Sequence, residues 1–108
     1  MKKTNILILM LIIFSIPCKS YSFTGNDMYE WVTTTRIKDV DIMSGLFMGE
    51  VSAAIYWSDP SKICIPKGAT SSQAYYIVEQ FVKSKPQYRH ENAQKIILRA
   101  LRQAWPCR

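Results

Sequence analysis

What this chain can fold into is constrained most by its N-terminal segment, which has the pattern of a secretory signal. Two lysines precede an almost unbroken apolar run from Ile6 to Ile16. A basic start, an apolar region of about 7–15 residues and small residues at the cleavage point define such a signal. Ser20-Tyr21-Ser22 places serines at the −3 and −1 positions, so we expect cleavage between Ser22 and Phe23. Residues 1–22 are then a cleaved signal peptide, and residues 23–108 form a single domain.

Two other readings of the N-terminal segment are weaker. As a membrane anchor, the apolar run is too short, because a helix of eleven residues rises about 16 Å against a hydrocarbon core of roughly 30 Å. We therefore expect no stable membrane insertion after cleavage. As a lipid attachment site, Cys18 follows the apolar run directly, but Pro17 is a poor fit to the small residue that such processing requires.

Signal cleavage changes the charge and the cysteine count of the chain. The full chain of 108 residues has 14 basic and 8 acidic side chains, a net charge of +6 and three cysteines. Removal of 22 residues takes away three lysines and Cys18, which leaves 86 residues, a charge of +3 and two cysteines. In an oxidising compartment, Cys64 and Cys107 most simply form one disulfide. A reactive thiol pair is less favoured, because no Cys-x-x-Cys motif is present.

Apolar periodicity predicts an all-α domain, a small bundle of about four helices crosslinked by the disulfide. The third predicted helix has its apolar residues at offsets 0, 3, 4, 7 and 8 from Ala74, and Thr70 and Gln73 match a capping box before it. A polar connection is expected from Arg36 to Asp41. The predicted helices run from about Asn26-Asp27 to Thr34, from Asp41 to Trp57, from Thr70 to Lys83, and from Ala93 to Trp105, with Glu91 expected in the first turn of the last.

The second predicted helix is apolar nearly all round, with Glu50 its one charge after Ile42, which indicates a mostly buried helix. Gly45, Gly49 and Ala53 recur every four residues along it. Each glycine costs a helix about 1 kcal/mol relative to alanine, so this stripe indicates close packing. The packing partner is either a helix of the same chain, which we favour, or a helix of a second subunit.

The sequence gives little support to catalysis, metal binding or nucleic-acid binding. A single histidine excludes a multi-histidine metal site, and no cofactor motif occurs. We expect no enzyme, with an envelope enzyme built around Glu50 and His90 as an alternative. Three basic residues on the last helix, Lys95, Arg99 and Arg102, are expected to form a solvated face, and we expect no nucleic-acid partner.

Two motifs, one around each cysteine of the pair, resemble a known family. The chain resembles the Rap/Tai family, the resistance-associated immunity proteins of bacterial type VI secretion. The resemblance covers roughly residues 45–107. It rests on Cys64-Ile65-Pro66-x-Gly68-x-Thr70-x-x-Gln73, on Pro86-x-x-Arg89-His90-x-x-Ala93, on Ala100-Leu101-x-x-Ala104-Trp105-Pro106-Cys107, and on the Gly45-x-x-x-Gly49 helix.

The resemblance implies a periplasmic, all-helical protein that is often a homodimer. It also implies a partner, a cognate peptidoglycan amidase that is delivered as a toxin. The protein would bind this amidase and block the active-site cleft of the enzyme. Many members carry a second cysteine pair at positions that correspond here to Val32 and Met43. Its absence implies a less firmly anchored first helix of the domain.

The connection before the last helix is the partner-binding segment that we expect. It combines hydrogen-bonding side chains with an aromatic residue, which are the residue types enriched at interface hot spots. An ordinary solvated loop is an equally good reading of the same residues, and Tyr75 and Tyr76 are rival contact sites. The candidate contact residues are Lys85, Gln87, Tyr88, Arg89 and His90.

One function from another class fits the same features. A periplasmic chaperone-like or stress-related binding protein would also be small, helical and crosslinked by one disulfide. Such a protein would suppress aggregation of many clients, with a switch to the active form at low pH as one variant. An immunity protein would instead protect against one toxin.

Overall fold

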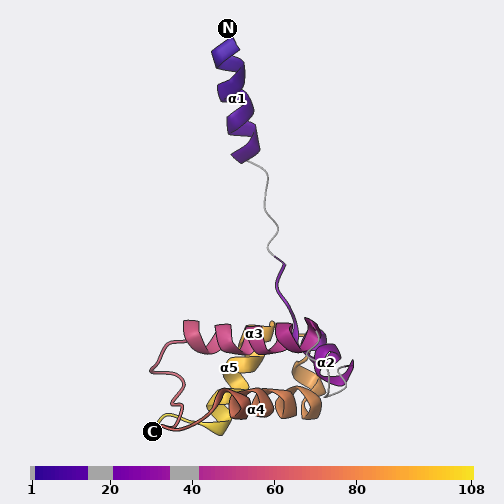
Figure 1. The fold of residues 1–108 in the computed structure, drawn as a ribbon, viewed down its shortest axis with the longest axis vertical. Helices are drawn as coiled ribbons and strands as arrows, with labels where there is room; N and C mark the ends of the chain where they lie inside the picture. Colours follow the sequence, from indigo (N-terminus) through magenta and orange to yellow (C-terminus); the bar gives the residue numbers. More distant parts are fainter. Residues whose placement is uncertain (1, 15–20, 35–41) are drawn as a thin grey trace.

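The computed structural model describes residues 2–14, 21–34 and 42–108. In these residues the chain forms five α-helices and one short 3₁₀ helix, and the only β-type pairing is an isolated bridge between Thr24 and Asn92. The all-α class is therefore confirmed. The elements in chain order are α1 Lys2–Phe14, α2 Gly25–Thr34, α3 Ile42–Trp57, α4 Ser71–Ser84, η1 Pro86–Tyr88 and α5 Ala93–Ala104 (Figure 1).

The count of about four helices is one too low, because Lys2–Phe14, which includes most of the apolar run of the expected signal, is itself helical as α1. Figure 1 draws α1 apart from the bundle that α2, α3, α4 and α5 form. No helix in the described part of the chain has the length and apolar content needed to cross a membrane. Cys18 and the predicted connection from Arg36 to Asp41 lie outside the described residues.

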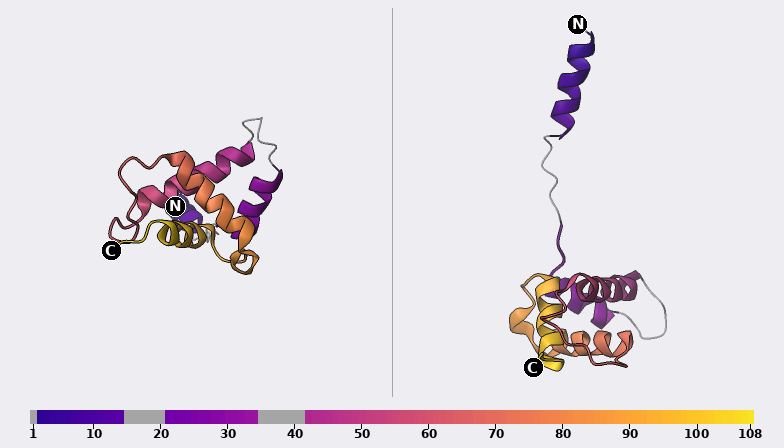
Figure 2. Two further views of the ribbon diagram at one scale, coloured as in Figure 1. Left: turned by 90° about the horizontal axis from the view of Figure 1, so that it is seen from below. Right: turned by 90° about the vertical axis from the view of Figure 1, so that its left-hand side faces the viewer.

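The hydrophobic core lies where α2, α3, α4 and α5 meet. Figure 2 shows α5 along one side of the α3–α4 pair, with α2 at one end of the bundle. The apolar faces predicted for α4 and α5 are the faces that these two helices bury. Each of the four helices contributes at least one side chain that is fully excluded from solvent: Met28, Val51, Val78, Ile97 and Leu101.

Side-chain caps fix where the helices begin. The Thr70 hydroxyl accepts from the Gln73 N–H at 3.3 Å, and the Gln73 side chain accepts from the Thr70 N–H at 2.8 Å, so the predicted capping box is confirmed. The start of α5 differs from the prediction, because Asn92 is its N-cap and Glu91 lies before the helix. Glu91 is therefore not a residue of the first turn of α5.

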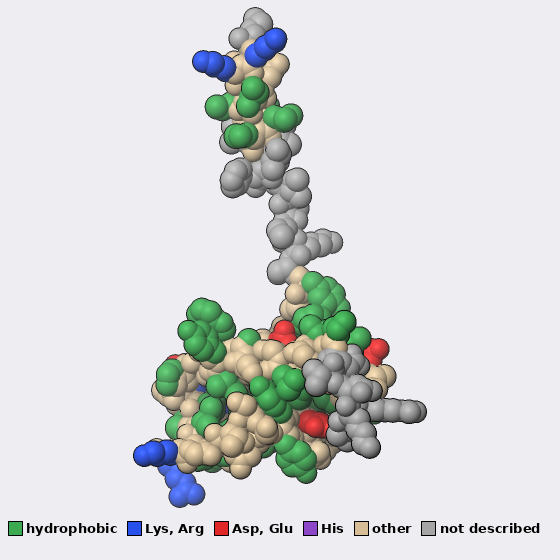
Figure 3. Space-filling model, viewed as in Figure 1, with side chains coloured by type: hydrophobic (Ala, Val, Ile, Leu, Met, Phe, Trp, Pro, Cys, Tyr) green, Lys and Arg blue, Asp and Glu red, His purple; other side chains and the backbone are tan. Residues whose placement is uncertain are grey.

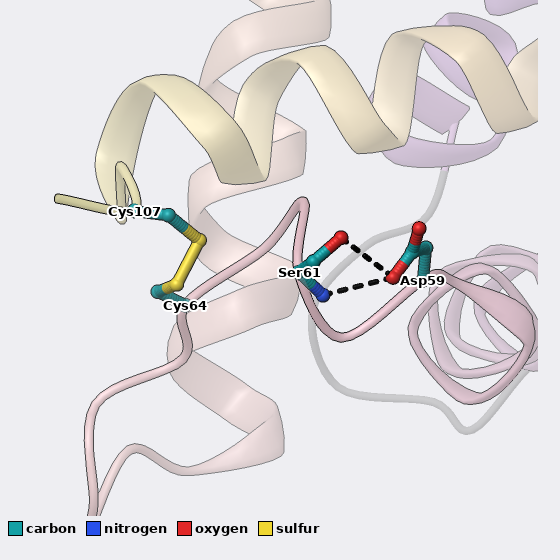
Figure 4. Close-up of a disulfide and its surroundings, with 4 residues drawn as sticks. All are labelled: Asp59, Ser61, Cys64 and Cys107. Carbon is teal, nitrogen blue, oxygen red and sulfur yellow. Dashed lines mark hydrogen bonds between the residues drawn. A yellow bond between two sulfur atoms is a disulfide. The ribbon is translucent and has the colours of Figure 1, made fainter.

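The predicted disulfide between Cys64 and Cys107 is present (Figure 4). It joins the α3–α4 connection to the segment after α5, and both cysteines are exposed. The adjacent Ile63 is buried, so the crosslink lies directly beside a core residue. The same connection contains a turn at Asp59, whose carboxylate accepts from both the N–H and the hydroxyl of Ser61.

Helix α3 is not mostly buried as expected. One face packs in the core through Phe47, Val51 and Ala54, while Gly45, Gly49 and Ala53 are exposed on the opposite face. A Cβ atom built on either glycine would have no described atom within 4 Å. The favoured interpretation, that another helix of the same chain packs on this stripe, is therefore wrong for the described residues. Period-based reasoning failed here because an all-apolar helix does not reveal which face the core uses.

Candidate functional site

The connection between α4 and α5 is short and compact. It runs from Lys85 through the 3₁₀ helix η1 to Asn92, which caps α5. Of the five candidate contact residues, Lys85, Gln87 and His90 are exposed, whereas Tyr88 and Arg89 are half-buried. The five residues therefore divide into three that face solvent and two that contact the rest of the domain.

Arg89 holds the connection against two helices. Its Nε donates to the Val82 carbonyl at 2.8 Å and its second guanidinium nitrogen donates to the Lys83 carbonyl at 2.8 Å. These two carbonyls belong to the last turn of α4, where backbone acceptors have no partner within the helix. The guanidinium carbon also lies 3.5 Å from the centre of the Tyr29 ring on α2, a cation–π contact. Arg89 is thus a structural residue that caps α4 and joins it to α2.

Tyr88 is likewise engaged within the domain. The Tyr88 ring stacks on the Phe81 ring, with the two centroids 5.9 Å apart. The Arg99 guanidinium carbon lies 4.3 Å from the centroid of the Tyr88 ring, a cation–π contact. Arg99 extends from α5 and also binds the Glu91 carboxylate, with nitrogen–oxygen distances of 3.1 and 3.0 Å. Tyr88, Arg99 and Glu91 therefore form one cluster that fixes the connection to α5.

The start of α2 braces the connection from a third side. The Asn26 N–H donates to the Arg89 carbonyl at 2.8 Å, and the Gly25 N–H donates to the Glu91 carbonyl at 3.0 Å. In return, the Ala93 N–H donates to the Phe23 carbonyl at 2.8 Å. Free amides at a helix N-terminus need acceptors, and here the connection supplies them. This contact anchors α2 at its first turn.

Sequence reasoning missed this contact and also misplaced the start of α2, although a signal for that start was present. The predicted start lay near Asn26-Asp27, whereas Thr24 and Asp27 form a reciprocal cap directly before and within the first turn. The Thr24 N–H and hydroxyl donate to the Asp27 carboxylate at 2.7 and 2.9 Å, and the Asp27 N–H donates to the Thr24 hydroxyl at 3.4 Å. The spacing Thr-x-x-Asp is a variant of the capping box. Gly25 within it is buried, and it allows α2 to approach the connection closely.

The Glu91–Arg99 pair makes stability depend on pH. The Arg99 guanidinium beside Glu91 holds the pKa of that carboxyl below its ordinary value of 4.5. A folded-state pKa below the unfolded one means that the pair stabilises the fold above about pH 4.5, and that this contribution is lost as pH falls through the folded-state pKa. Glu91→Gln is expected to remove this part of the acid dependence.

The measurement is chemical denaturation of both proteins from pH 3 to pH 7. The difference in free energy of unfolding between the wild type and Glu91→Gln should be constant above about pH 5 and shrink below pH 4.5. Asp59, whose pKa is lowered mainly by hydrogen bonds from Ser61, contributes to the same acid limb in both proteins and cancels in the difference. Parallel pH profiles would show that the pair contributes nothing.

The exposed face of α3 is a second candidate surface. At its end, Tyr56 and Trp57 are 79% and 83% exposed, and their rings meet edge to face with centroids 5.2 Å apart. Figure 3 shows apolar side chains projecting from this end of α3. Ile42, at the other end of the helix, is 78% exposed. The face is therefore apolar at both ends, with the small residues Gly45, Gly49 and Ala53 between them.

The rival aromatic sites on α4 differ from each other. The Tyr75 hydroxyl is hydrogen-bonded to the Ser52 hydroxyl at 2.9 Å, so this half-buried side chain joins α4 to α3. Tyr76 is 63% exposed and lines a shallow groove with Ile77 and Trp105.

The two residues considered for catalysis, Glu50 and His90, lie on different elements, α3 and the connection between α4 and α5. The Gln94 side chain on α5 donates to a carboxylate oxygen and to the backbone carbonyl of Glu50, so Glu50 serves as a contact between α3 and α5. His90 is exposed on the connection. Among the described residues, no group of three or more metal-ligating side chains lies close enough together to hold a metal ion.

Comparison with known proteins gives one match. A family model described as Rap1a immunity proteins matches residues 24–107, which includes all four helices of the bundle. No curated protein and no solved structure matches the chain. The matched region begins at Thr24, the N-cap of α2, and ends at Cys107 of the disulfide. The chain therefore belongs to the Rap1a immunity protein family.

Proposed function

We propose that this protein is a periplasmic immunity protein of type VI secretion that binds and blocks a peptidoglycan amidase toxin. Export through the N-terminal signal places it where such a toxin acts. Membership of an immunity protein family supports the proposal at the level of the family. The observation that carries it further is the connection between α4 and α5, which is braced on three sides and presents Lys85, Gln87 and His90 to solvent.

The mechanism that we propose is steric. A connection held by α2, α4 and α5 loses little conformational entropy when it enters a groove, and preorganisation of this kind favours tight binding. The three exposed side chains would make the direct contacts. Tyr88 and Arg89, which sequence reasoning also assigned to the partner, contact the domain itself and act by holding the connection in shape.

Substitution of the exposed and the half-buried residues separates these two roles. We expect Lys85→Ala, Gln87→Ala and His90→Ala together to weaken toxin binding by about 100-fold while changing stability little, because surface truncations cost stability less than about 0.5 kcal/mol each. Arg89→Ala should instead lower the free energy of unfolding by about 2 kcal/mol, because two hydrogen bonds from a charged donor are lost. Calorimetric titration with the toxin and chemical denaturation measure the two effects.

A matched control uses Lys62→Ala with Lys67→Ala, since both lysines are exposed on the connection between α3 and α4. This pair should change neither quantity. If the triple substitution binds toxin as tightly as the wild type does, the connection is an ordinary solvated loop.

In cells, the proposal predicts specific protection. Expression in the periplasm should rescue a sensitive strain from the amidase encoded beside this gene and from no unrelated cell-wall hydrolase. Expression without residues 1–22 should give no protection, because the protein would then stay on the wrong side of the membrane. General resistance to protein aggregation, in place of resistance to one toxin, would favour the chaperone-like alternative.

We also propose that the exposed face of α3 pairs two copies of the protein. Gly45 and Gly49 leave room for the backbone of a second helix, and Tyr56 and Trp57 provide apolar area around it. Gly49→Leu should fill this space and convert dimer to monomer in sedimentation velocity, with the helix content unchanged. A wild-type protein that sediments as a monomer at high micromolar concentration would contradict this proposal.

A further inference from the structure

Charge is distributed unevenly along the domain. Residues 60–108 contain nine basic and two acidic side chains, whereas residues 23–59 contain two basic and six acidic ones. The basic part comprises the disulfide-linked connection, α4 and α5, and the acidic part comprises α2, α3 and the segment between them. A net charge of +3 for the domain therefore conceals a strongly basic half.

Among the described residues, two of the three basic side chains of α5 have no acidic partner. In the basic half, Lys83 is paired with Glu79 on α4. Arg89 donates hydrogen bonds to backbone carbonyls in the last turn of α4. Helix α5 carries Lys95, Arg99 and Arg102 and no acidic side chain. Only Arg99 of these three is paired among the described residues, with Glu91 before the helix.

The three cations line one groove. Their spacing of four and three residues places them on one face of the helix, where like charges repel each other by a few tenths of a kcal/mol per pair. Together with Leu98 and Gln103 they line a groove of about 340 Å³. Arg99 is held in place by Glu91 and by the Tyr88 ring, while Lys95 and Arg102 are exposed beside it. A fixed guanidinium and two exposed cations form a preorganised site for carboxylates.

The groove is continuous with the connection that is proposed to enter the toxin. Tyr88 belongs to that connection, and its ring lies directly beneath the Arg99 guanidinium that lines the groove. The groove and the connection therefore meet at the contact between Tyr88 and Arg99.

We infer that the α5 groove, defined by Lys95, Leu98, Arg99, Arg102 and Gln103, binds an acidic surface segment of the toxin beside its cleft. This inference rests on the proposed function and adds the chemistry of the partner surface. A protein surface fits better than a bilayer, because three of the four large apolar side chains of α5, Ile96, Ile97 and Leu101, are buried in the core and cannot insert into lipid. Only the half-buried Leu98 lines the groove, and one such side chain is too little for membrane insertion. The groove steers association and fixes the orientation in which the connection meets the toxin.

Charge reversal with a matched control tests the inference. Lys95→Glu with Arg102→Glu reverses two charges in the groove, and Lys62→Glu with Lys67→Glu makes the same change of net charge on the α3–α4 connection. Arg99 stays unchanged, because it holds Glu91. Thermal melts establish that both variants are folded, and stopped-flow mixing with the purified toxin measures the association rate constant at 50 mM and 500 mM salt.

We expect the groove variant to associate about 10- to 100-fold more slowly at 50 mM salt, with most of the difference lost at 500 mM because salt screens the charges. The control variant should differ from the wild type by less than about threefold. Equal slowing by both variants would overturn the inference, because it would assign steering to net charge alone. Toxin binding with no effect of either variant would also overturn it, while leaving the proposed function intact.

Two other outcomes decide against the inference in different ways. If the wild type cosediments with phosphatidylglycerol vesicles, and only this binding is lost in the groove variant, the groove binds a membrane instead of a toxin. If the wild type shows no binding to the toxin at all, the proposed function fails, and the inference fails with it.

Discussion

Replacement of Cys64 and Cys107 by serine is expected to lower the free energy of unfolding by about 4 kcal/mol. The two residues are 43 positions apart, so the disulfide closes about half of the expected mature chain into a loop and reduces the entropy of the unfolded state accordingly. A domain of this size buries a small share of its surface, and its total stability is on the order of 5–10 kcal/mol. Urea denaturation at neutral pH measures the loss.

Reduction of the wild type serves as the control for this double substitution. Wild-type protein in reductant should unfold at the same urea concentration as the double serine variant, whereas reductant should leave the variant unchanged. A loss of less than about 1 kcal/mol would mean that the core around Ile63 and Trp105 holds the two segments together without the crosslink.

Substitution of Gly25 by alanine is expected to cost about 3 kcal/mol. A Cβ atom at this position would lie 2.7 Å from the Arg89 Cα and 2.9 Å from the Arg89 carbonyl oxygen, and 2.3 Å from the end of the Ile96 side chain. Ile96 could rotate away, but the backbone at Arg89 could move only by lengthening the hydrogen bonds that dock α2 on the connection. Overpacking of this kind typically costs 1–3 kcal/mol, and roughly 1 kcal/mol follows for each hydrogen bond lost.

Gly45→Ala is the matched control, since a Cβ atom at Gly45 would have no described atom within 4 Å. In a helix, this change should stabilise the monomer by up to about 1 kcal/mol. The two alanine substitutions are thus expected to change stability in opposite directions, which thermal denaturation of dilute protein would reveal. Equal effects would contradict the close approach of α2 to the connection. Toxin binding should weaken in Gly25→Ala alone, because this contact holds the connection in shape.

The helices of the bundle could be predicted from the sequence because each of α4 and α5 has one apolar face, and a period of 3.6 residues identifies such a face directly. The disulfide was predicted from the two cysteines that remain after the expected cleavage. Helix α3 shows the limit of the method: it is apolar on all sides, so its sequence does not distinguish the buried face, which carries Val51, from the exposed face, which carries Gly49.

The contact residues show a second limit. Arg89 and Tyr88 have side chains typical of an interface, and the sequence alone gave no reason to separate them from Gln87. Part of their role is set by residues on other helices, Tyr29 of α2 for Arg89 and Arg99 of α5 for Tyr88. Such pairings depend on how α2 and α5 pack against the connection, and local sequence patterns do not encode this packing. For the same reason, the docking of Gly25 on the connection was missed.

Inhibition of the purified toxin tests the account most directly. The proposed amidase partner is incubated with peptidoglycan and increasing amounts of the expected mature protein, residues 23–108, and the release of cleaved peptides is measured. The account predicts that release stops near one protein chain per toxin active site, and that the triple variant at Lys85, Gln87 and His90 inhibits about 100-fold more weakly. Undiminished cleavage in the presence of excess folded wild-type protein would contradict it.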